Sequence, residues 1–334
     1  MFNKLITRRS YNYRILINTC PSNRESLAFT YKAYINGNYL LSYGVLIPNY
    51  GISSALAVLR RILLNIPISK DLVENMNYYI WYNGVKLSSS SSVKKYIRMV
   101  KRVGDVILSS PYSDKGPNKE VNEDSTGFLT VKHCSGIRQK LVHIFAIADG
   151  VSSLQRGDYA SSFAVKSFML KVSSLIVNNL NLDLKETIMD MHDELLNSLR
   201  GSNMNTGTTF TGGVITYMGE VPRVTIAHIG DTRAYRIMGG KVEKLTRDHS
   251  LGGHAITQAL GYIVNNVDIV TATLERDSYL VLTTDGVTDV LTDEHIGYIT
   301  YSNRYPTNIS VGLVHTARTY GSTDDASALT IWYV

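Results

Sequence analysis

The sequence predicts an α+β protein, and three observations support that prediction. Asn36-Gly37 separates two apolar runs near the N-terminus, which indicates a β-hairpin. In the second half, several β-branched runs end in an aspartate, as strands followed by turns often do. Between those runs lie two stretches with apolar residues at helical spacing. Together they favour a layered fold in which amphipathic helices cover sheets.

Charge divides the chain into two unlike parts. The 334 residues are enough for two domains, and the formal net charge of +6 is unevenly spread. Residues 1–113 hold 15 Lys and Arg against 4 Asp and Glu, whereas the remainder is net acidic. Turn-forming residues cluster from Ser109 to Gly116, where we expect a boundary between two domains. We therefore predict a basic α+β module over residues 1–108 and a second domain over residues 109–334. Ser88–Ser92 is an alternative boundary, which we interpret as a solvated loop before a helix.

Composition also restricts the cellular setting. Cys20 and Cys134 cannot make a disulfide framework or a four-thiolate zinc site, so we expect a reducing, cytoplasmic location. Residues 1–20 carry basic side chains but lack the apolar core of a signal peptide. Proline, arginine and asparagine interrupt the longest apolar stretch, around residues 45–68, so we expect no membrane span.

The first hundred residues are expected to form the hairpin, a helix, a further strand and a second helix. The strands are Phe29–Ile35, Tyr39–Ile47 and Tyr78–Tyr82, and the helices lie around residues 56–64 and 93–103. This order faintly resembles a ribonuclease H-like fold. The chain has no Asp or Glu between Glu25 and Asp71, however, where that fold needs metal ligands. The resemblance therefore implies a module without catalytic residues.

Basic residues concentrate on the expected helix over residues 93–103. Lys and Arg neutralise phosphates, so this helix could contact nucleic acid or an acidic protein partner. No interleaved aromatic pattern or recognised binding motif accompanies it, which favours a solvated surface instead. Both interpretations stay open at this point.

Acidic residues recur at strand ends in the second half of the chain. A single Asp-Gly after a strand is usually a turn. Here four acidic strand ends occur together with an acidic pair before a fifth strand, which indicates a shared site. The expected strands Leu141–Ala148, Val224–Ile229 and Tyr279–Thr284 lead into Asp149-Gly150, Gly230-Asp231 and Asp285-Gly286, while Glu123-Asp124 and Asp324-Asp325 precede Thr126–Lys132 and Ala326–Val334.

Such a site needs cations if the carboxylates converge. Two carboxylates about 4 Å apart repel by roughly 4 kcal/mol at an effective dielectric constant of about 20. Oxygen ligands without Cys or His motifs beside them favour hard divalent ions such as Mg2+ or Mn2+ over zinc. Glycine after the aspartate lets the backbone approach a ligand closely, so the Gly150 carbonyl is a further candidate ligand.

Ordered motifs over about two thirds of the chain resemble one known family. From near Asp114 to Val334 they follow the order found in the type 2C, or PPM, metal-dependent serine/threonine protein phosphatases. Eight motifs match in sequence, so the resemblance is highly specific. They are Asn122-Glu123-Asp124, Ala148-Asp149-Gly150, Gly207-Thr208-Thr209, His228 to Tyr235, Leu245 to Ser250, Ile256 to Gly261, Thr284-Asp285-Gly286 and Asp324-Asp325.

The resemblance implies a four-layer α-β-β-α sandwich of two antiparallel sheets flanked by helices, with a two-metal centre at one edge. The sequence independently supplies helices to cover the sheets. Apolar stripes run from Ala164 to Leu175 and from Leu184 to Leu199, and both are expected to pack in the core. Asp183 with Glu186 resembles a capping box at the start of the second stripe.

The resemblance also implies roles for the acidic residues. Asp149 is expected to bridge two Mg2+ or Mn2+ ions, with the Gly150 carbonyl completing one of them. Asp285 and Asp324 are expected to hold the other ion. Two such cations lower the pKa of a shared water, which attacks phosphorus in line without a covalent enzyme intermediate.

Further motif residues are expected to support this centre. Glu123 and Asp124 are expected to act through metal-bound waters, and Asp231 and Asp289 match positions that hold a third ion with Asp285 in relatives. Residues 207–209 and the rest of 230–235 are interpreted as strand and turn structure. The histidines in or beside apolar strands or turns are interpreted as structural, namely His133, His143, His228 and His249.

The chain departs from the family pattern at three places. Lys119 stands where the family usually has an arginine that binds the substrate phosphate through two parallel hydrogen bonds. Lysine keeps the charge but loses this bidentate geometry, which predicts weaker phosphate binding. Val151 follows Asp149-Gly150, where many eukaryotic relatives have a histidine regarded as a general acid. Only Leu251–Ala255 fill the place of a longer flap, so we expect an open metal site.

These observations favour an enzyme that hydrolyses phosphoserine and phosphothreonine in phosphoprotein substrates, as part of signalling. The basic first module is then expected to recruit or regulate. The alternative is a pseudophosphatase, in which Lys119 and the short flap leave a phosphoprotein-binding scaffold. A scaffold has no need to keep Asp149, Asp285 and Asp324 together, so the sequence favours catalysis.

Overall fold

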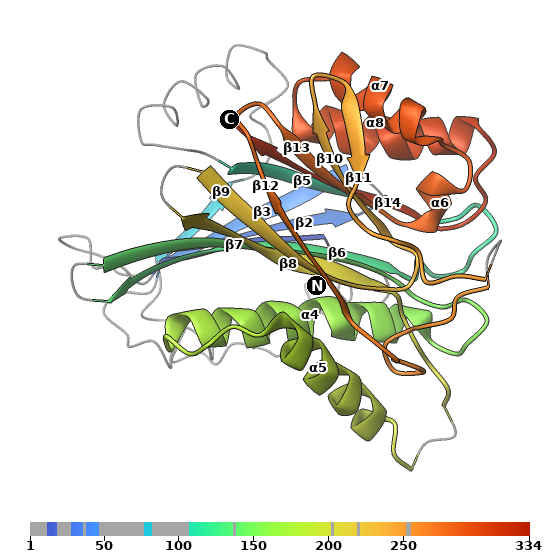
Figure 1. Ribbon diagram of the computed structural model, residues 1–334, viewed down its shortest axis with the longest axis horizontal. Coiled ribbons are helices and arrows are strands. Elements are labelled where there is room, and N and C mark those ends of the chain that lie inside the picture. The colour runs from blue at the N-terminus through green and yellow to red at the C-terminus, as the bar shows by residue number, and fades with distance from the viewer. Residues whose placement is uncertain are drawn as a thin grey trace.

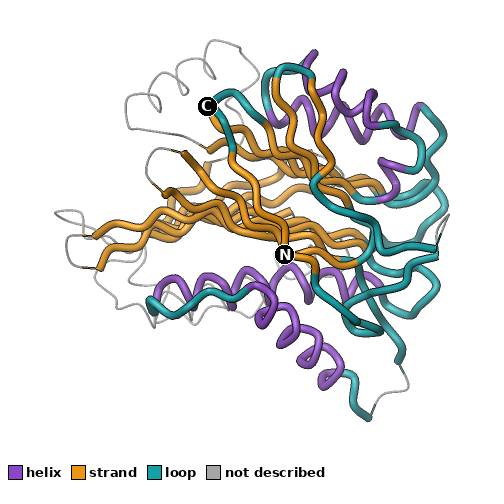
Figure 2. Tube along the Cα trace, in the orientation of Figure 1, coloured by secondary structure: helices purple, strands orange, loops and turns teal. Residues whose placement is uncertain are grey.

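The computed structural model describes most of the chain from Ile107 to Val334 and four strands before it (Figure 2). Within the second part, residues 136–137, 202–203, 219–220 and 252–254 are not described. Before residue 107, the description covers the backbone of four strands, β1 Asn12–Asn18, β2 Ala28–Ile35, β3 Asn38–Leu46 and β4 Asn77–Trp81.

Most of the described strands form two large sheets that pack face to face (Figure 1), and β2, β3 and β4 form a separate three-stranded sheet. The six-stranded sheet has the order β1-β6-β7-β8-β9-β12, and the five-stranded sheet has the order β11-β10-β13-β14-β5. Apart from β1, which runs parallel to β6, neighbouring strands in both sheets are antiparallel. The strands added here are β5 Ile107–Asp114, β6 Asp124–Ser135, β7 Arg138–Asp149, β8 Phe210–Met218, β9 Val221–Ile229, β10 Arg233–Met238, β11 Lys241–Lys244, β12 Asp268–Thr273, β13 Tyr279–Thr283 and β14 Ala326–Tyr333.

Helices cover the outer face of each sheet, so the predicted four-layer α-β-β-α sandwich is confirmed. Figure 1 shows α4 and α5 below the six-stranded sheet and α7 and α8 above the five-stranded sheet. Separate apolar clusters fill the three interfaces, and the cluster between the sheets includes Phe128, Phe145 and Leu329. The helices are α4 Gly157–Val177, α5 Leu184–Ser198, α6 Asp285–Thr288, α7 Asp293–Ser302 and α8 Pro306–Thr319.

Near the N-terminus, β2 pairs antiparallel with β3 where the sequence predicts a hairpin, and Ile35 lies opposite Asn38. β4 covers most of the strand predicted around Tyr78 and pairs with β3. The two helices predicted around residues 56–64 and 93–103 lie outside the described residues, as does the serine run Ser88–Ser92. The division of the chain at residue 108 stays a prediction.

Residues Ser109–Asp114 are a correction to the sequence analysis. The cluster of Ser, Pro and Tyr predicts a turn, but these residues belong to β5, which pairs with β14 at the edge of the five-stranded sheet. An edge strand tolerates Pro111, because one side of its backbone needs no partner strand. The long-range pairing with β14 therefore overrides the local turn composition.

Helix α4 is long and apolar enough to cross a membrane, judged by length and composition alone. In the structure, 56% of that apolar window is buried. Ala164, Phe168 and Val172 pack into the cluster between α4, α5 and the six-stranded sheet. The apolar composition of α4 is thus accounted for by its position in the core, and the absence of a membrane span stays a prediction.

Asp183 caps α5 as the sequence predicts, because its carboxylate accepts hydrogen bonds from the Lys185 and Glu186 N–H groups at 2.8 and 3.1 Å. We expect Asp183→Ala to lower the free energy of unfolding by about 1 kcal/mol in a urea titration. Asp183→Ser keeps a capping oxygen and should remain within about 0.5 kcal/mol of wild type. Equal losses in the two variants would contradict a capping role.

Candidate active site

The acidic strand ends come together at one end of the sandwich. Asp124 opens β6 and Asp149 closes β7, and the two residues lie opposite each other in the antiparallel register. Asp285 follows β13 and begins α6, which lies at the right-hand end of the sandwich in Figure 1. The Thr284 hydroxyl donates a hydrogen bond to Asp124 Oδ2 at 3.0 Å, which ties the two sheets together at this end.

Asp149 and Asp285 lie close enough for each carboxyl group to influence the pKa of the other. Burial raises the pKa of Asp149 well above its ordinary value, and the charges of Asp285 and Asp124 raise it further. Burial also raises the pKa of Asp285, where the charge of Asp324 adds to the effect. The structure therefore brings together the three aspartates on which the sequence-based hypothesis depends.

Asp124 is the most deeply buried member of this group, with 1% of its surface exposed. Burial raises its pKa well above the ordinary value, followed by the charge of Asp325. Three buried carboxylate oxygens lack a hydrogen-bond partner, namely Oδ1 of Asp124, Asp231 and Asp285. Unpaired buried carboxylate oxygens in a repulsive cluster fit hard divalent cations, which accept oxygen ligands and neutralise the charge.

Asp231 belongs to the same electrostatic group. Burial raises its pKa to about 7, and the charges of Asp285, Asp248 and Asp289 contribute. Asp231 lies in the turn between β9 and β10, immediately after Gly230, whose φ is 99°. Asp289 is exposed at the end of α6 and acts on this group through its charge on Asp231.

Lys119 occupies the middle of several carboxylates. Its ammonium group pairs with Asp324 and lies 3.4 Å from both Glu123 Oε2 and Asp325 Oδ2. Burial works against the charged lysine, but the Asp324 hydrogen bond and the charges of Asp325 and Asp149 hold its pKa above the ordinary value. In the described part of the chain, no three His, Cys, Asp or Glu side chains are already arranged to hold one metal ion. The carboxylates converge around an ammonium group here.

Asp325 is a site residue that sequence reasoning missed. Its buried carboxylate accepts hydrogen bonds from the Gly116 and Glu123 N–H groups at 2.8 and 2.7 Å. These bonds fix the loop that carries Lys119 and Glu123 against the start of β14. The sequence shows Asp324 and Asp325 only as an adjacent acidic pair. The fold shows that Asp325 is buried and holds the loop, whereas the side chain of Asp324 is partly exposed.

Glycine after Asp149 and after Asp285 permits close approach of protein backbone. A Cβ on Gly150 would lie 2.4 Å from the carbonyl carbon of Gly157, at the start of α4. A Cβ on Gly286 would lie 1.9 Å from the Asp325 carbonyl oxygen. Both contacts are far shorter than real Cβ contacts. The glycines let neighbouring segments close up on the acidic group, in addition to the ligand approach that the sequence suggests.

The residues after Gly150 border the cluster on its solvent side. Ser152 is exposed, and its hydroxyl accepts a hydrogen bond from Lys119 Nζ at 2.8 Å and donates one to Glu123 Oε2 at 3.1 Å. Val151 N–H binds the Gly207 carbonyl at 3.0 Å, which places the 207–209 motif beside the Asp-Gly turn. Lys119, from the loop between β5 and β6, and Ser152, from the loop after β7, therefore lie together next to the carboxylates.

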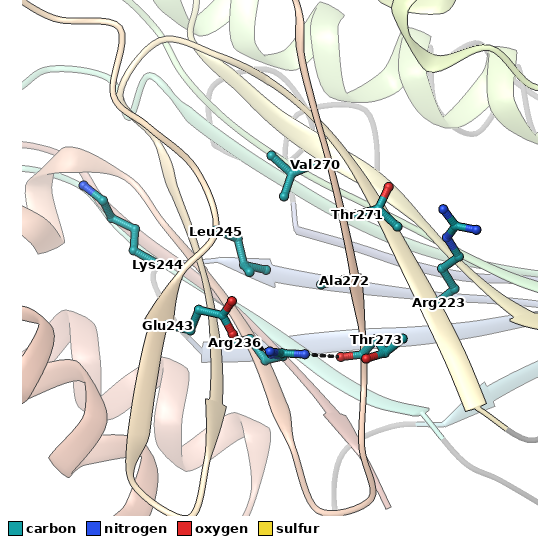
Figure 3. A pocket seen from close by; sticks show the side chains of 9 residues that line it. All are labelled: Arg223, Arg236, Glu243, Lys244, Leu245, Val270, Thr271, Ala272 and Thr273. Atoms are coloured by element: carbon teal, nitrogen blue, oxygen red, sulfur yellow. Dashed lines mark hydrogen bonds and ion pairs between the residues drawn. The ribbon is translucent and has the colours of Figure 1, made fainter.

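A cavity of about 560 Å3 lies elsewhere, between edge strands of the two sheets (Figure 3). Its charged side chains have partners: Arg236 pairs with Glu243 and donates to the Thr273 carbonyl at 3.0 Å, and Lys244 lies 3.5 Å from Asp248. None of the acidic strand-end residues lines it. It is lined by Arg223, Arg236, Glu243, Lys244, Leu245, Val270, Thr271, Ala272 and Thr273.

The geometry can now be compared with known proteins. Residues 117–308 match the family model described as protein phosphatase 2C, which covers more than half of the chain. The chain belongs to the protein phosphatase 2C family. The match begins two residues before Lys119 and includes most of the acidic strand ends, so the family assignment and the cluster rest on the same region.

Relatives and solved structures are similar over the same part of the chain. The serine/threonine phosphatase stp of Listeria monocytogenes is 24% identical over 66% of this chain and 93% of its own length. The probable protein phosphatase 2C 69 of Arabidopsis thaliana is 26% identical over 60% of this chain and 64% of its own length.

The fold of the phosphatase Stp1 from Staphylococcus aureus matches with a TM-score of 0.56, at 22% identity over 69% of this chain and 96% of that one. The PPM phosphatase MsPP from Mycobacterium smegmatis matches with a TM-score of 0.55, at 23% identity over 67% of this chain and 97% of that one. Together with the two sheets described above, these matches establish the PPM-type fold for this family member.

His228 lies beside this site and predicts a pH dependence of stability. The buried imidazole contacts the Thr211 hydroxyl at 2.8 Å and the Arg247 carbonyl at 3.0 Å. Burial, followed by the nearby His249, lowers its pKa to about 4. The unfolded chain binds this proton near pH 6.5, so the stabilisation is complete above that pH and is lost as pH falls toward about 4, by up to roughly 3 kcal/mol.

We therefore expect the free energy of unfolding of His228→Gln to fall less than that of wild type between about pH 7 and about pH 4.5. Urea titrations at several pH values measure this difference, and the carboxylates titrate in both proteins. His315→Gln replaces an exposed imidazole and should keep the wild-type slope. Parallel slopes for His228→Gln and wild type would contradict a buried neutral His228.

Proposed function

We propose that this chain is a metal-dependent protein phosphatase that hydrolyses phosphoserine and phosphothreonine. The observation that carries the proposal is the cluster of buried carboxylates with unpaired oxygens, located in a chain of the protein phosphatase 2C family. Without cations, the buried Asp124 and the partly buried Asp149 and Asp285 would hold repulsive charges with little access to water, which destabilises the fold. Divalent cations remove that cost and supply the reactivity.

The proposed ligands for two Mg2+ or Mn2+ ions are Asp149, the Gly150 carbonyl, Asp285 and Asp324. Glu123 and Asp124 are proposed to act through intervening waters, and Asp231 with Asp289 to hold a third ion. When bound, such ions supply the Lewis acidity that lowers the pKa of water and stabilises the charge of a phosphoryl group. All of these ligands are hard oxygen donors, which supports Mg2+ or Mn2+ over zinc.

Lys119 is proposed to bind the substrate phosphate. Its ammonium group is already held beside Glu123 and Ser152 at the solvent side of the cluster. A cation that neutralises Asp324 would weaken the pair between Asp324 and Lys119, which frees the lysine charge for an incoming phosphate. The Ser152 hydroxyl is a second polar group in reach of Lys119 and can orient the same phosphate oxygens.

Val151 cannot supply a proton to the leaving serine or threonine oxygen. Water that reaches the exposed side of the cluster is then the proposed proton source. The short segment Leu251–Ala255, of which residues 252–254 lie outside the description, supports an open site with broad access for protein substrates. We propose that the first module, residues 1–108, recruits or regulates in the cytoplasm, through an acidic protein or nucleic-acid partner if its basic helix is a binding surface.

Hydrolysis of p-nitrophenyl phosphate and of a phosphothreonine peptide tests the proposed activity. We expect wild type to act on both with Mn2+ and to lose activity in the presence of a chelator. Asp149→Asn removes a charge from the centre of the cluster and should lower kcat by at least about a hundredfold, since metal activation of water is lost.

Asp193→Asn is the matched control, because Asp193 is exposed on α5 and should leave the rate unchanged. Equal rates for Asp149→Asn and wild type would contradict the enzyme proposal. Binding of the phosphothreonine peptide by wild type without turnover would instead support a phosphoprotein-binding scaffold.

Lys119 variants test phosphate binding separately. Lys119→Ala removes a charged hydrogen bond and should raise KM for p-nitrophenyl phosphate about tenfold or more. Lys119→Arg keeps the charge and adds a planar fork, so it should retain or improve KM, and inorganic phosphate should inhibit it at least as well as wild type. Equal kinetic effects of the two substitutions would contradict the assigned role.

A further inference from the structure

Two of the sequence motifs lie side by side in the structure. Asp231 is their single proposed metal ligand. Residues 245–249 run along residues 228–234, which contain the end of β9, the turn at 230–232 and the start of β10. The Leu245 N–H binds the Ala234 carbonyl at 2.8 Å, and the Ala234 N–H binds the Thr246 hydroxyl at 3.0 Å. The motif that contains Asp231 is thus held along its length by the second motif.

Asp248 holds one end of this turn. Its carboxylate accepts hydrogen bonds from Arg233 Nε at 3.1 and 3.0 Å and from Arg233 Nη2 at 2.7 Å. A fork of this kind fixes the position of both side chains. Burial works against the Asp248 charge, but Arg233 holds the pKa of Asp248 below its ordinary value. Arg233 is two residues after Asp231, so this pair anchors the turn on that side.

His249 holds the other end through a single residue, Gly230. Its backbone N–H binds the Gly230 carbonyl at 2.7 Å, and its Nδ1 accepts the Gly230 N–H at 3.2 Å. Gly230 has a φ of 99°, a conformation that glycine adopts readily and other residues rarely do. His249 therefore forms hydrogen bonds with both the N–H and the carbonyl group of Gly230, the residue that immediately precedes Asp231.

The imidazole of His249 has its tautomer fixed by these contacts. Because Nδ1 accepts from Gly230, the ring proton lies on Nε2, which faces Asp268 Oδ2 at 3.0 Å. Burial works against the charge of Asp268, but the hydrogen bond from His249 holds its pKa below the ordinary value. Asp268 begins β12, so the ring is supported by the edge of the six-stranded sheet.

His249 also connects to the short segment that replaces a longer flap. Its carbonyl accepts the Thr257 N–H at 2.8 Å, and Ser250 pairs with Ile256 in an isolated bridge. These contacts pair residues 249–250 with residues 256–257 and hold His249 in place from this side.

We propose that His249 is a positioning residue that fixes the Gly230-Asp231 turn and thereby the orientation of the Asp231 carboxylate. The proposal rests on the proposed function, in which Asp231 is a metal ligand. Hydrogen bonds of this outer kind typically change metal affinity about tenfold to a hundredfold when they are removed. The sequence-based interpretation of His249 as merely structural is the alternative.

Two conservative substitutions separate these interpretations. The amide oxygen that His249→Asn introduces can lie near the position of Nδ1 and accept the Gly230 N–H. His249→Gln reaches instead toward Asp268 and leaves that N–H without its acceptor. Both remove the ring that lies 4.9 Å from the His228 ring, so a purely structural role predicts similar effects.

The measurement is Mn2+ binding to the full chain, followed by the electron paramagnetic resonance signal of free Mn2+. We expect His249→Asn to bind its weakest Mn2+ within about threefold of wild type, and His249→Gln to lose at least about tenfold in that affinity. Asp231→Asn should lose the same ion. Adding His249→Gln to Asp231→Asn should then cause no further loss, because the two residues act through one ligand.

The outcomes distinguish this inference from the proposed function. Wild type that binds no Mn2+ and hydrolyses no phosphomonoester overturns the proposed function itself. Equal Mn2+ affinities of His249→Asn and His249→Gln, or additive losses in the double variant, overturn only the role of His249. If His249→Gln does not fold, His249→Ala tests the same point, because it also leaves the Gly230 N–H without its acceptor. It should lose the same Mn2+ affinity as His249→Gln, and binding equal to that of His249→Asn would overturn the inference.

Discussion

Repulsion among buried carboxylates is the constraint on which the organisation of this end of the molecule depends. Asp124, Asp149 and Asp285 have raised pKa values because burial and mutual charge oppose their ionisation. The fold compensates with Lys119 and with backbone N–H groups that hold Asp325. Even with those contacts, one carboxylate oxygen each of Asp124, Asp231 and Asp285 has no hydrogen-bond partner. A stable fold and a demand for cations thus arise from the same arrangement.

The two sheets create this arrangement jointly. β6 and β7 bring Asp124 and Asp149 opposite each other, while β13 and β14 bring the residues around Asp285 and Asp325 to the same end. Neither sheet alone carries the whole group. Gly150 and Gly286 allow the connecting segments to approach more closely than any side chain would permit. Precision at the site is therefore a property of the sandwich as a whole, in agreement with the family to which the chain belongs.

Local patterns predicted individual strands and helices, whereas the four-layer arrangement was predicted from the family resemblance. The β-branched runs of β7 and β13 and the apolar stripes of α4 and α5 carry their own periodicity, and the ordered acidic motifs identified which residues to compare. β5 was missed because its composition is that of a turn, and only pairing with β14 makes it a strand. The contacts of Asp325 and His249 were missed for a related reason. Each depends on partners far along the chain, and no spacing rule places them together.

The parallel strand β1 gives the first part of the chain a role in the sheet that carries Asp124. Asn12 to Asn18 pair with Thr126 to Lys132 along the outer side of β6. Strand edges with unpaired backbone groups invite association with other chains. A shortened protein that started at β5 would leave this side of β6 bare. Its solubility would then fall through edge-to-edge association, even if every acidic residue were still present.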